Sequence, residues 1–265
     1  MKVPSGCGWL LPVVSLLPAL AQQRTPQAVN FYSIEKETSE GQAASATLRS
    51  GLSLIRQPKL DAYLAKLTAD LSKQAPGPFP YIVAIYGGVP GAATVALTMP
   101  ADALLFGATE PVAVAGGAIF VPVSMVADAP NETVLAFQLA HAMAHISLRH
   151  ATRLATRADI SRGGGAQAAP RLAFLAFARQ LELEADAAAV PMIAAAGYDP
   201  AEVVAYLQKL PPAGNEGMST AFSAHPTTAE RLETIRAEAE KLPARKYGAG
   251  TGEFEAMKSL AAGVR

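Results

Sequence analysis

A long apolar segment opens at Asp128-Ala129-Pro130-Asn131 and is expected to form one helix that runs through Arg149 or beyond. Inside it, the run Leu139-Ala140-His141-Ala142-Met143-Ala144-His145 places two histidines four residues apart. Because residues at this spacing share one face of a helix, both imidazoles can reach a single zinc ion. The pair alone is weak evidence, since two partly buried histidines that bond to the backbone or to solvent would have the same spacing.

A second segment, Glu182-Leu183-Glu184-Ala185-Asp186, supplies the acidic groups that such a site needs. It lies in a later apolar stretch, Arg171–Ala196, which is expected to be helical and to stop at Gly197. Two histidines, one carboxylate and a water form a catalytic zinc arrangement. The alternative is a solvated helix face, but Glu182 and Asp186 would then be like charges one turn apart, which is mildly unfavourable. A shared metal ion would remove that objection.

The other elements predict one α+β domain. Of the 265 residues, 51% are hydrophobic, which is enough for a full core and excludes disorder as the main state. Helices and a few strands follow one another in separate parts of the chain, which is typical of an α+β fold. The expected helices cover Ser33–Ile55, Pro58–Lys73, Ala201–Leu210 and Ala229–Leu242, and the expected strands cover Tyr81–Tyr86, Ala93–Met99 and Val112–Val123. Pro122 has no amide donor, so the last of these strands is expected at a sheet edge.

Charge and cysteine content exclude several classes of function. The 22 basic and 22 acidic residues balance, so no basic excess is present to hold a nucleic-acid backbone. The single cysteine, Cys7, excludes an internal disulfide and a cysteine-based metal cluster.

The first 21 residues have the pattern of a secretory signal. Lys2 precedes the apolar stretch Trp9–Ala21, which ends in the small-x-small run Ala19-Leu20-Ala21. The stretch is shorter than the about 20 residues that a spanning helix needs. We expect cleavage after Ala21, and a mature chain of residues 22–265 in the periplasm or at the cell envelope. An uncleaved anchor remains the alternative.

Several motifs together resemble peptidase family M48, in its short periplasmic form without a C-terminal repeat domain. The strand Gly116-Gly117-Ala118-Ile119-Phe120-Val121, the histidine pair followed by Arg149-His150, and the acidic segment at Glu182 are each similar to a family motif. So is the late run Ser223-x-His225-Pro226 with Arg231. The likeness extends from about Ser33 to Leu242.

This resemblance implies a mostly helical, zincin-like metallopeptidase domain whose small sheet has its edge strand beside the active-site cleft. The domain would cover residues 22–265, with a core over 33–242 and a tail over 243–265. One zinc ion would be held by His141, His145 and Glu182. Asp186 would orient one of the zinc histidines, and His150 would either support the ligands or lie at the surface. His225 would stabilise the reacting oxyanion or occupy the metal's open position, and Gly117, Ile119, Phe120 and Val121 would form the edge strand that binds an extended substrate.

One departure from the family pattern bears directly on activity. The family has His-Glu-x-x-His, and Ala142 stands here in place of that glutamate. In zincins the glutamate accepts a proton from the zinc-bound water that hydrolyses the peptide bond, and losing a general base costs about 10²–10⁴ in rate. Glu110, Ala189 and the apparent insertion Gly88–Thr109 also depart from the pattern, which favours natural divergence over one designed change.

Three functions remain open from the sequence. The chain is an active or weakly active zinc endopeptidase that acts on unfolded envelope proteins, or a pseudo-protease that binds extended polypeptides without cutting them, as a chaperone or adaptor does. The third is a scaffold in which zinc only braces two helices. Ala142 favours the second over the first. Membrane association of the mature chain is left open, but not through a spanning helix.

Overall fold

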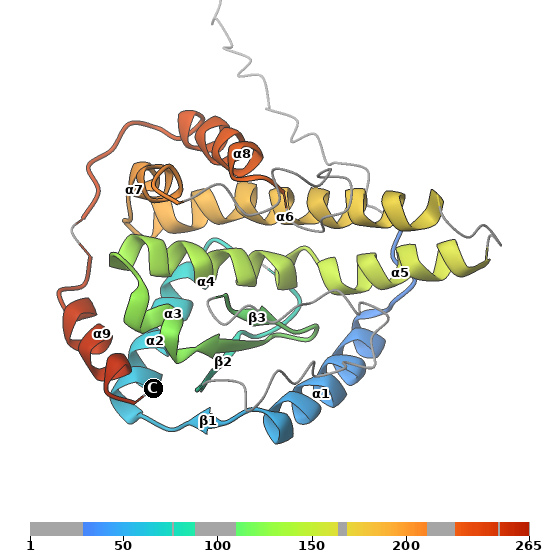
Figure 1. Cartoon of the computed structure of the whole chain (residues 1–265), viewed down its shortest axis with the longest axis horizontal. Helices are drawn as coiled ribbons and strands as arrows, with labels where there is room; N and C mark the ends of the chain where they lie inside the picture. The colour runs from blue at the N-terminus through green and yellow to red at the C-terminus, as the bar shows by residue number, and fades with distance from the viewer. Residues whose placement is uncertain are drawn as a thin grey trace, which may run out of the picture.

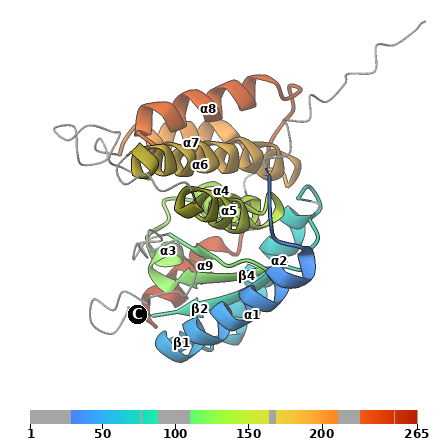
Figure 2. The ribbon, with the colours of Figure 1, turned by 90° about the vertical axis from the view of Figure 1, so that its right-hand side faces the viewer.

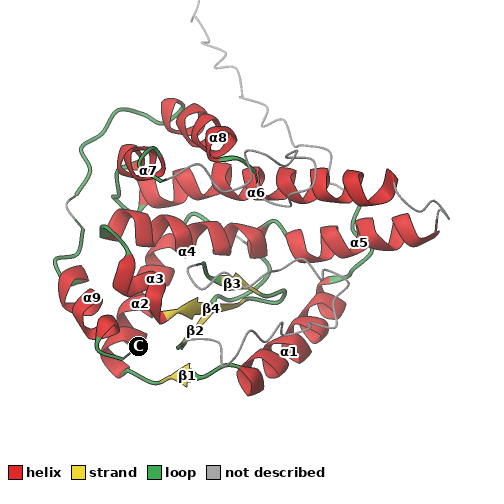
Figure 3. Cartoon of the chain, viewed as in Figure 1, coloured by secondary structure: helices red, strands yellow, loops and turns green. Residues whose placement is uncertain are grey.

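A computed structural model describes residues 29–75, 77–87, 110–163, 169–210, 226–248 and 250–264, with the main chain only for 161–163 and 169–173. Within these residues helices dominate and four short strands form one sheet (Figures 1 and 3). In chain order the elements are α1 (Ile34–Gly51), β1 (Leu54–Ile55), α2 (Pro58–Ser72), β2 (Ile82–Tyr86), β3 (Val112–Ala113), β4 (Ala118–Pro122), α3 (Val123–Asp128), α4 (Glu132–Ser147), α5 (His150–Gly163), α6 (Ala169–Ala195), α7 (Pro200–Leu207), α8 (Thr228–Glu240) and α9 (Phe254–Ala262). The expected α+β class is confirmed.

The sheet separates two apolar cores. Its strand order is β1-β2-β4-β3, with β2 and β4 parallel and both outer pairs antiparallel. Because side chains alternate along a strand, Phe120 faces the smaller core beside Leu48 of α1, whereas Ile119 and Val121 face the main core. Figure 2 shows α4 lying over the sheet and α6 lying beyond α4. The helix with the two histidines is therefore an inner layer.

The expectation that β4 is an edge strand is wrong for the described part of the chain. The apolar run Val112–Val123 turns back on itself, so that β3 pairs with Ile119 and Phe120 while β2 pairs with the other side of β4. All five residues of β4 are buried. Pro122 is the last residue of the strand, where its missing amide does not interrupt the ladder.

Two glycines allow segments to approach one another closely at this hairpin. Gly117 has φ +111°, and a Cβ there would collide with the carbonyl oxygen of Pro80. A Cβ on Gly41, in the middle of α1, would collide with the carbonyl oxygen of Ala115. Gly41 is therefore a packing requirement rather than a weak point of the helix. The helix expected over Ser33–Ile55 ends at Gly51, and its last residues form β1 instead.

Helix α4 begins where expected but ends early. The Asn131 side chain caps it by accepting from the backbone N–H of Val134 at 2.9 Å. Phe137 and Met143 are buried within it, since α4 packs between the sheet and α6. The helix does not run through Arg149, because that residue adopts φ +57° and a new helix, α5, starts at His150.

Later helix boundaries agree with the capping signals in the sequence. Helix α6 ends just before Gly197, which has φ +100°. Thr227 and Glu230 form a capping box at the start of α8, with both reciprocal hydrogen bonds present.

The C-terminal segment belongs to the core, although the sequence left it unassigned beyond residue 242. Helix α9 packs against α3 and α2, and its Phe254 and Ala261 are buried in the main core. Thr251 donates to the buried carboxylate of Glu132 from its N–H at 2.6 Å and from its hydroxyl at 2.8 Å. The expected core limits of 33–242 are therefore too narrow.

Some expected features lie outside the described residues: the signal segment, the strand Ala93–Met99, the whole Gly88–Thr109 insertion and His225. None of the helices in the described ranges combines the length and the apolar character that crossing a membrane requires.

Candidate metal centre

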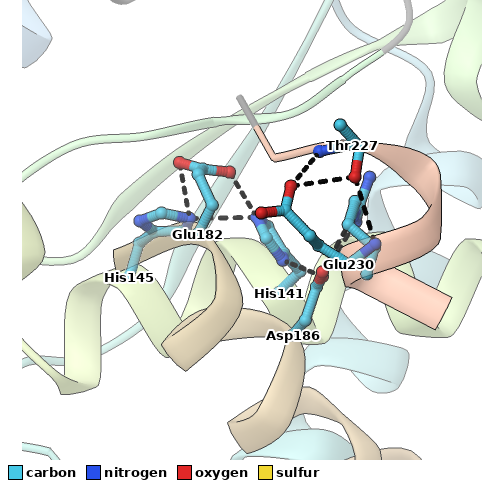
Figure 4. Close-up of polar contacts among 7 residues, drawn as sticks. His141, His145, Glu182, Asp186, Thr227 and Glu230 are labelled. Atoms are coloured by element: carbon cyan, nitrogen blue, oxygen red, sulfur yellow. Dashed lines mark hydrogen bonds and ion pairs between the residues drawn. The ribbon is translucent and has the colours of Figure 1, made fainter. Parts of the chain in front are cut away.

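Two packed helices bring the three expected zinc ligands together. Helix α4 carries His141 and His145 one turn apart, and α6 runs along α4 with Glu182 directed at both rings (Figure 4). One ligand atom from each residue lies within 4.8 Å of the other two. Residues 41 positions apart in the chain are thus neighbours in space because α6 folds back over α4.

The donor set suits zinc. The Nε2 atoms of the two histidines lie 2.9 Å apart. Glu182 places Oε2 at 3.3 Å from Nε2 of His141 and Oε1 at 3.5 Å from Nε2 of His145. All three side chains direct ligand atoms at one point, and two imidazole nitrogens with a carboxylate oxygen are a zinc-binding combination.

Asp186 and Arg231 hold His141 in a fixed orientation. Asp186 is fully buried and accepts a hydrogen bond from Nδ1 of His141 at 2.9 Å. Arg231, which lies on α8, donates to both oxygens of that carboxylate, at 2.7 and 2.8 Å. With Nδ1 bonded to Asp186, Nε2 is the ring nitrogen of His141 that faces Glu182 and could bind a metal once its proton is displaced. Of the two candidate ligand histidines, Asp186 therefore contacts His141.

The same contacts give His141 and His145 very different pKa values. Burial disfavours the charged form and lowers the pKa of His145 to about 3. Burial has the same effect at His141, but hydrogen bonds to Asp186 and Glu182 outweigh it and raise the pKa of His141 to about 9. A metal ion at Nε2 of His141 must therefore displace a proton.

His150 is buried against the far side of His145, and the surface alternative for it is wrong. Its ring is 2% exposed, and its Nδ1 lies 3.1 Å from Nδ1 of His145. In an unbroken helix His150 would lie about 140° around the axis from His145. The left-handed turn at Arg149 removes that separation.

Glu184 points away from the candidate ligand atoms and has partners of its own. Its carboxylate accepts from Nη1 of Arg153 on α5 at 2.7 Å and lies 3.5 Å from Nε2 of His150. The close approach of the His150 ring and the Arg153 guanidinium lower the pKa of Glu184 to about 2, although burial acts against them. Arg153 had no role in the sequence analysis, because nothing in its spacing indicates a contact with α6.

A second ion pair, between Arg149 and the buried Glu37, fixes the bend between α4 and α5. Glu37 on α1 is 1% exposed and accepts from Nε of Arg149 at 2.6 Å and from the hydroxyl of Thr152 at 3.0 Å. Arg149 also donates to the carbonyl oxygen of Tyr32 at 2.6 Å. These contacts hold Arg149 in a conformation that is otherwise costly for a residue with a side chain.

The remaining expected site residues do not line an exposed cleft among the described residues: they are buried or lie outside the described part of the chain. Ala142 is 1% exposed and packs in the main core next to His141. Ile119, Phe120 and Val121 are fully buried, and Gly117 packs against the carbonyl of Pro80, so these four residues do not form an exposed strand edge. His225 lies outside the described residues, immediately before the segment that leads into α8.

The comparison with protein families agrees with this geometry. Residues 110–239 match the family model described as Peptidase family M48. The matched region begins before β3 and ends within α8, so the M48 match contains all three candidate ligands as well as Asp186 and Arg231. The match supports a metallopeptidase-type function, and the matched family is zinc-dependent. No curated protein matches the chain.

Proposed function

We propose that the chain is an exported zinc protein of peptidase family M48, with impaired peptide-bond hydrolysis because Ala142 replaces the general-base glutamate. One zinc ion would be bound by His141, His145 and Glu182. The observation that carries the proposal is the convergence of these ligand atoms within 4.8 Å inside the M48 match.

The surroundings of the ligands support metal binding over a merely structural histidine pair. Each imidazole turns Nε2 toward Glu182, and Asp186 and His150 stand at the opposite nitrogens. This is the arrangement by which proteins set the tautomer of metal-binding histidines. A bound zinc ion would polarise a substrate carbonyl and lower the pKa of a coordinated water to about 7.

The impairment follows from the chemistry of position 142. Hydrolysis needs a group that takes a proton from the attacking water and delivers it to the leaving amine. The methyl group of Ala142 can do neither, and Asp186 is already held by His141 and Arg231. Loss of such a base lowers turnover by about 10²–10⁴.

Metal analysis tests the zinc site. Protein purified without chelator is expected to contain about one zinc per chain, and His141→Ala or Glu182→Ala is expected to lose most of it. Gln180→Ala, which changes an exposed side chain on the same helix, is the matched control and should retain zinc. Wild-type protein without zinc, or full zinc retention in His141→Ala, would contradict the proposal.

Restoring the carboxylate tests the impairment. Ala142→Glu is expected to cleave casein about 10²-fold faster than wild type, because it supplies the missing proton acceptor. Burial at this position would raise the pKa of the new carboxyl, toward the range in which a general base works best. Ala142→Gln, of the same size but not basic, is the control and should stay as slow as wild type. If wild type already matches Ala142→Glu and Glu182→Ala abolishes both rates, another group is the base.

A non-cleaving role is the second candidate, and Ala142 is the observation that favours it. A protein with intact ligands and no base would bind extended polypeptides as a chaperone or adaptor. Since β4 is bonded on both sides at Ile119 and Phe120, a polypeptide would have to bind elsewhere than along those residues. Zinc-loaded Ala142→Glu that binds casein but stays inert would favour this role.

A further inference from the structure

We infer that His150 is a positioning residue for the metal, which accepts the Nδ1 proton of His145 and is itself oriented by Glu184 and Arg153. The inference rests on the proposed zinc site, since it concerns how His145 is held ready to bind through Nε2. The contact of His150 with His145 is separate from the contact that Asp186 makes with His141.

The contact between the two rings determines where the proton lies. The Nδ1 atoms of His145 and His150 are 3.1 Å apart, which is hydrogen-bond distance and leaves room for one proton between them. Nε2 of His145 points at Glu182, 3.5 Å away. When Nε2 binds a metal, the neutral ring carries its proton on Nδ1. His145 is then the donor and His150 the acceptor.

The other ring nitrogen of His150, Nε2, faces Glu184. If Nδ1 of His150 accepts, the neutral ring carries its proton on Nε2. That atom is buried, makes no hydrogen bond to the described residues, and lies 3.5 Å from Oε2 of Glu184. The same oxygen accepts from Nη1 of Arg153 at 2.7 Å. The carboxylate therefore stands where it favours an N–H on Nε2 over a lone pair.

Each of the two proposed zinc histidines is thus oriented by a carboxylate that an arginine holds, directly for His141 and through one further residue for His145. His141 bonds directly to Asp186, which Arg231 holds, whereas His145 reaches Glu184 and Arg153 only through His150. The imidazole rings of His145 and His150 meet edge to face, with centroids 4.9 Å apart and an interplanar angle of 87°. This contact restricts rotation of the His145 ring.

A pair of substitutions at position 150 tests the inference. His150→Leu removes the acceptor, and His150→Asn keeps an acceptor oxygen near the position of Nδ1. Chelator competition is expected to show zinc binding about 10–100-fold weaker in His150→Leu, with most of the affinity restored in His150→Asn. Long-range ¹⁵N spectra of zinc-loaded wild type are expected to show His145 protonated at Nδ1, and a proton at Nε2 of His145 would overturn the inference.

A second pair of substitutions, at Glu184 and Gln180, tests the inference even if His150→Leu fails to fold. Glu184→Ala removes the carboxylate that orients His150 and is expected to weaken zinc binding in the same direction. Gln180→Ala removes only the exposed amide that bonds the same carboxylate at 3.0 Å, and should bind zinc as wild type does. Unchanged zinc affinity in folded His150→Leu or in Glu184→Ala, while His145→Ala loses zinc, would overturn this inference alone. Wild type that binds no zinc would overturn the proposed function instead.

Discussion

At the scale of single residues, three acidic side chains on α6 have three different partners. Glu182 faces both His141 and His145, Asp186 bonds to His141 and Arg231, and Glu184 bonds to Arg153 beside His150. Each carboxylate is therefore compensated by nearby donors or cations. This explains how a short acidic run can be buried or half-buried between helices without mutual repulsion.

The raised pKa of His141 predicts a pH-dependent metal affinity. Asp186 and Glu182 raise the pKa of His141 to about 9, so below that pH the ring is protonated and zinc must release the proton. Zinc affinity is therefore expected to rise with pH, by about tenfold per unit between pH 6 and 8. Chelator competition at several pH values measures this.

Asp186→Asn provides the control for the pH dependence. It removes one of the charges that raise the pKa of His141, so its zinc affinity should change less steeply with pH. An equally steep change of zinc affinity with pH in Asp186→Asn would show that the contact between His141 and Asp186 does not hold the proton that zinc displaces.

At the scale of elements, the histidine helix is positioned by packing on both sides. The sheet and the turn between β3 and β4 lie on one side of α4, and α6 lies on the other (Figure 2). Helix α1 closes the far face of the sheet, where Gly41 touches the carbonyl of Ala115. Displacement of α1 would also disturb Glu37, which holds Arg149 at the bend before His150.

Gly41→Ala is expected to destabilise the protein despite the better helix propensity of alanine. The added methyl group would overlap a backbone oxygen that cannot move independently, and overpacking of this kind costs about 1–3 kcal/mol. The free energy of unfolding from urea titration measures the effect. Gly51→Ala, at the exposed end of the same helix, is the matched control and is expected to be neutral or stabilising by up to about 1 kcal/mol. Equal effects at both positions would contradict the close contact.

At the scale of the whole molecule, the C-terminal segment closes the main core. Phe254 is 6% exposed, and α9 packs against both α2 and α3. The segment before it bonds to Glu132 at the start of α4, which also accepts from the hydroxyl of Tyr63 at 2.7 Å. The last helix is thereby connected to α4, which carries two of the candidate metal ligands.

Phe254→Ala is expected to lower the free energy of unfolding by about 3–5 kcal/mol, because it leaves a cavity in the core. Glu255→Ala, on the exposed side of α9, should change it by no more than about 0.5 kcal/mol. Thermal or urea denaturation compares the two. A loss below 1 kcal/mol in Phe254→Ala would mean that α9 is not part of the cooperative core.

The export proposal concerns the N-terminal 21 residues, which lie outside the described part of the chain. Secreted protein is expected to begin at Gln22, since Ala19-Leu20-Ala21 matches the signal-peptidase pattern. Intact-mass measurement of exported material checks this. Retention of Met1 in a membrane fraction would support the anchor alternative.

Features that depend on neighbouring residues were determined by the sequence alone. The spacing of His141 and His145 places them on one helix face, because helix geometry depends only on residue number. The stop at Gly197 followed in the same way, from backbone chemistry within a few positions. The M48 motifs added Glu182 as the expected partner across the fold.

Only the tertiary structure decided the features that depend on distant contacts. The place of β4 inside the sheet comes from pairing with β2 and β3, which the amide missing at Pro122 does not reveal. The burial of His150 comes from the left-handed turn at Arg149, which is held by Glu37 from 112 positions earlier in the chain. Short-range patterns carry no information about such partners, because the free energy that selects them arises only when α1, α4 and α6 pack together.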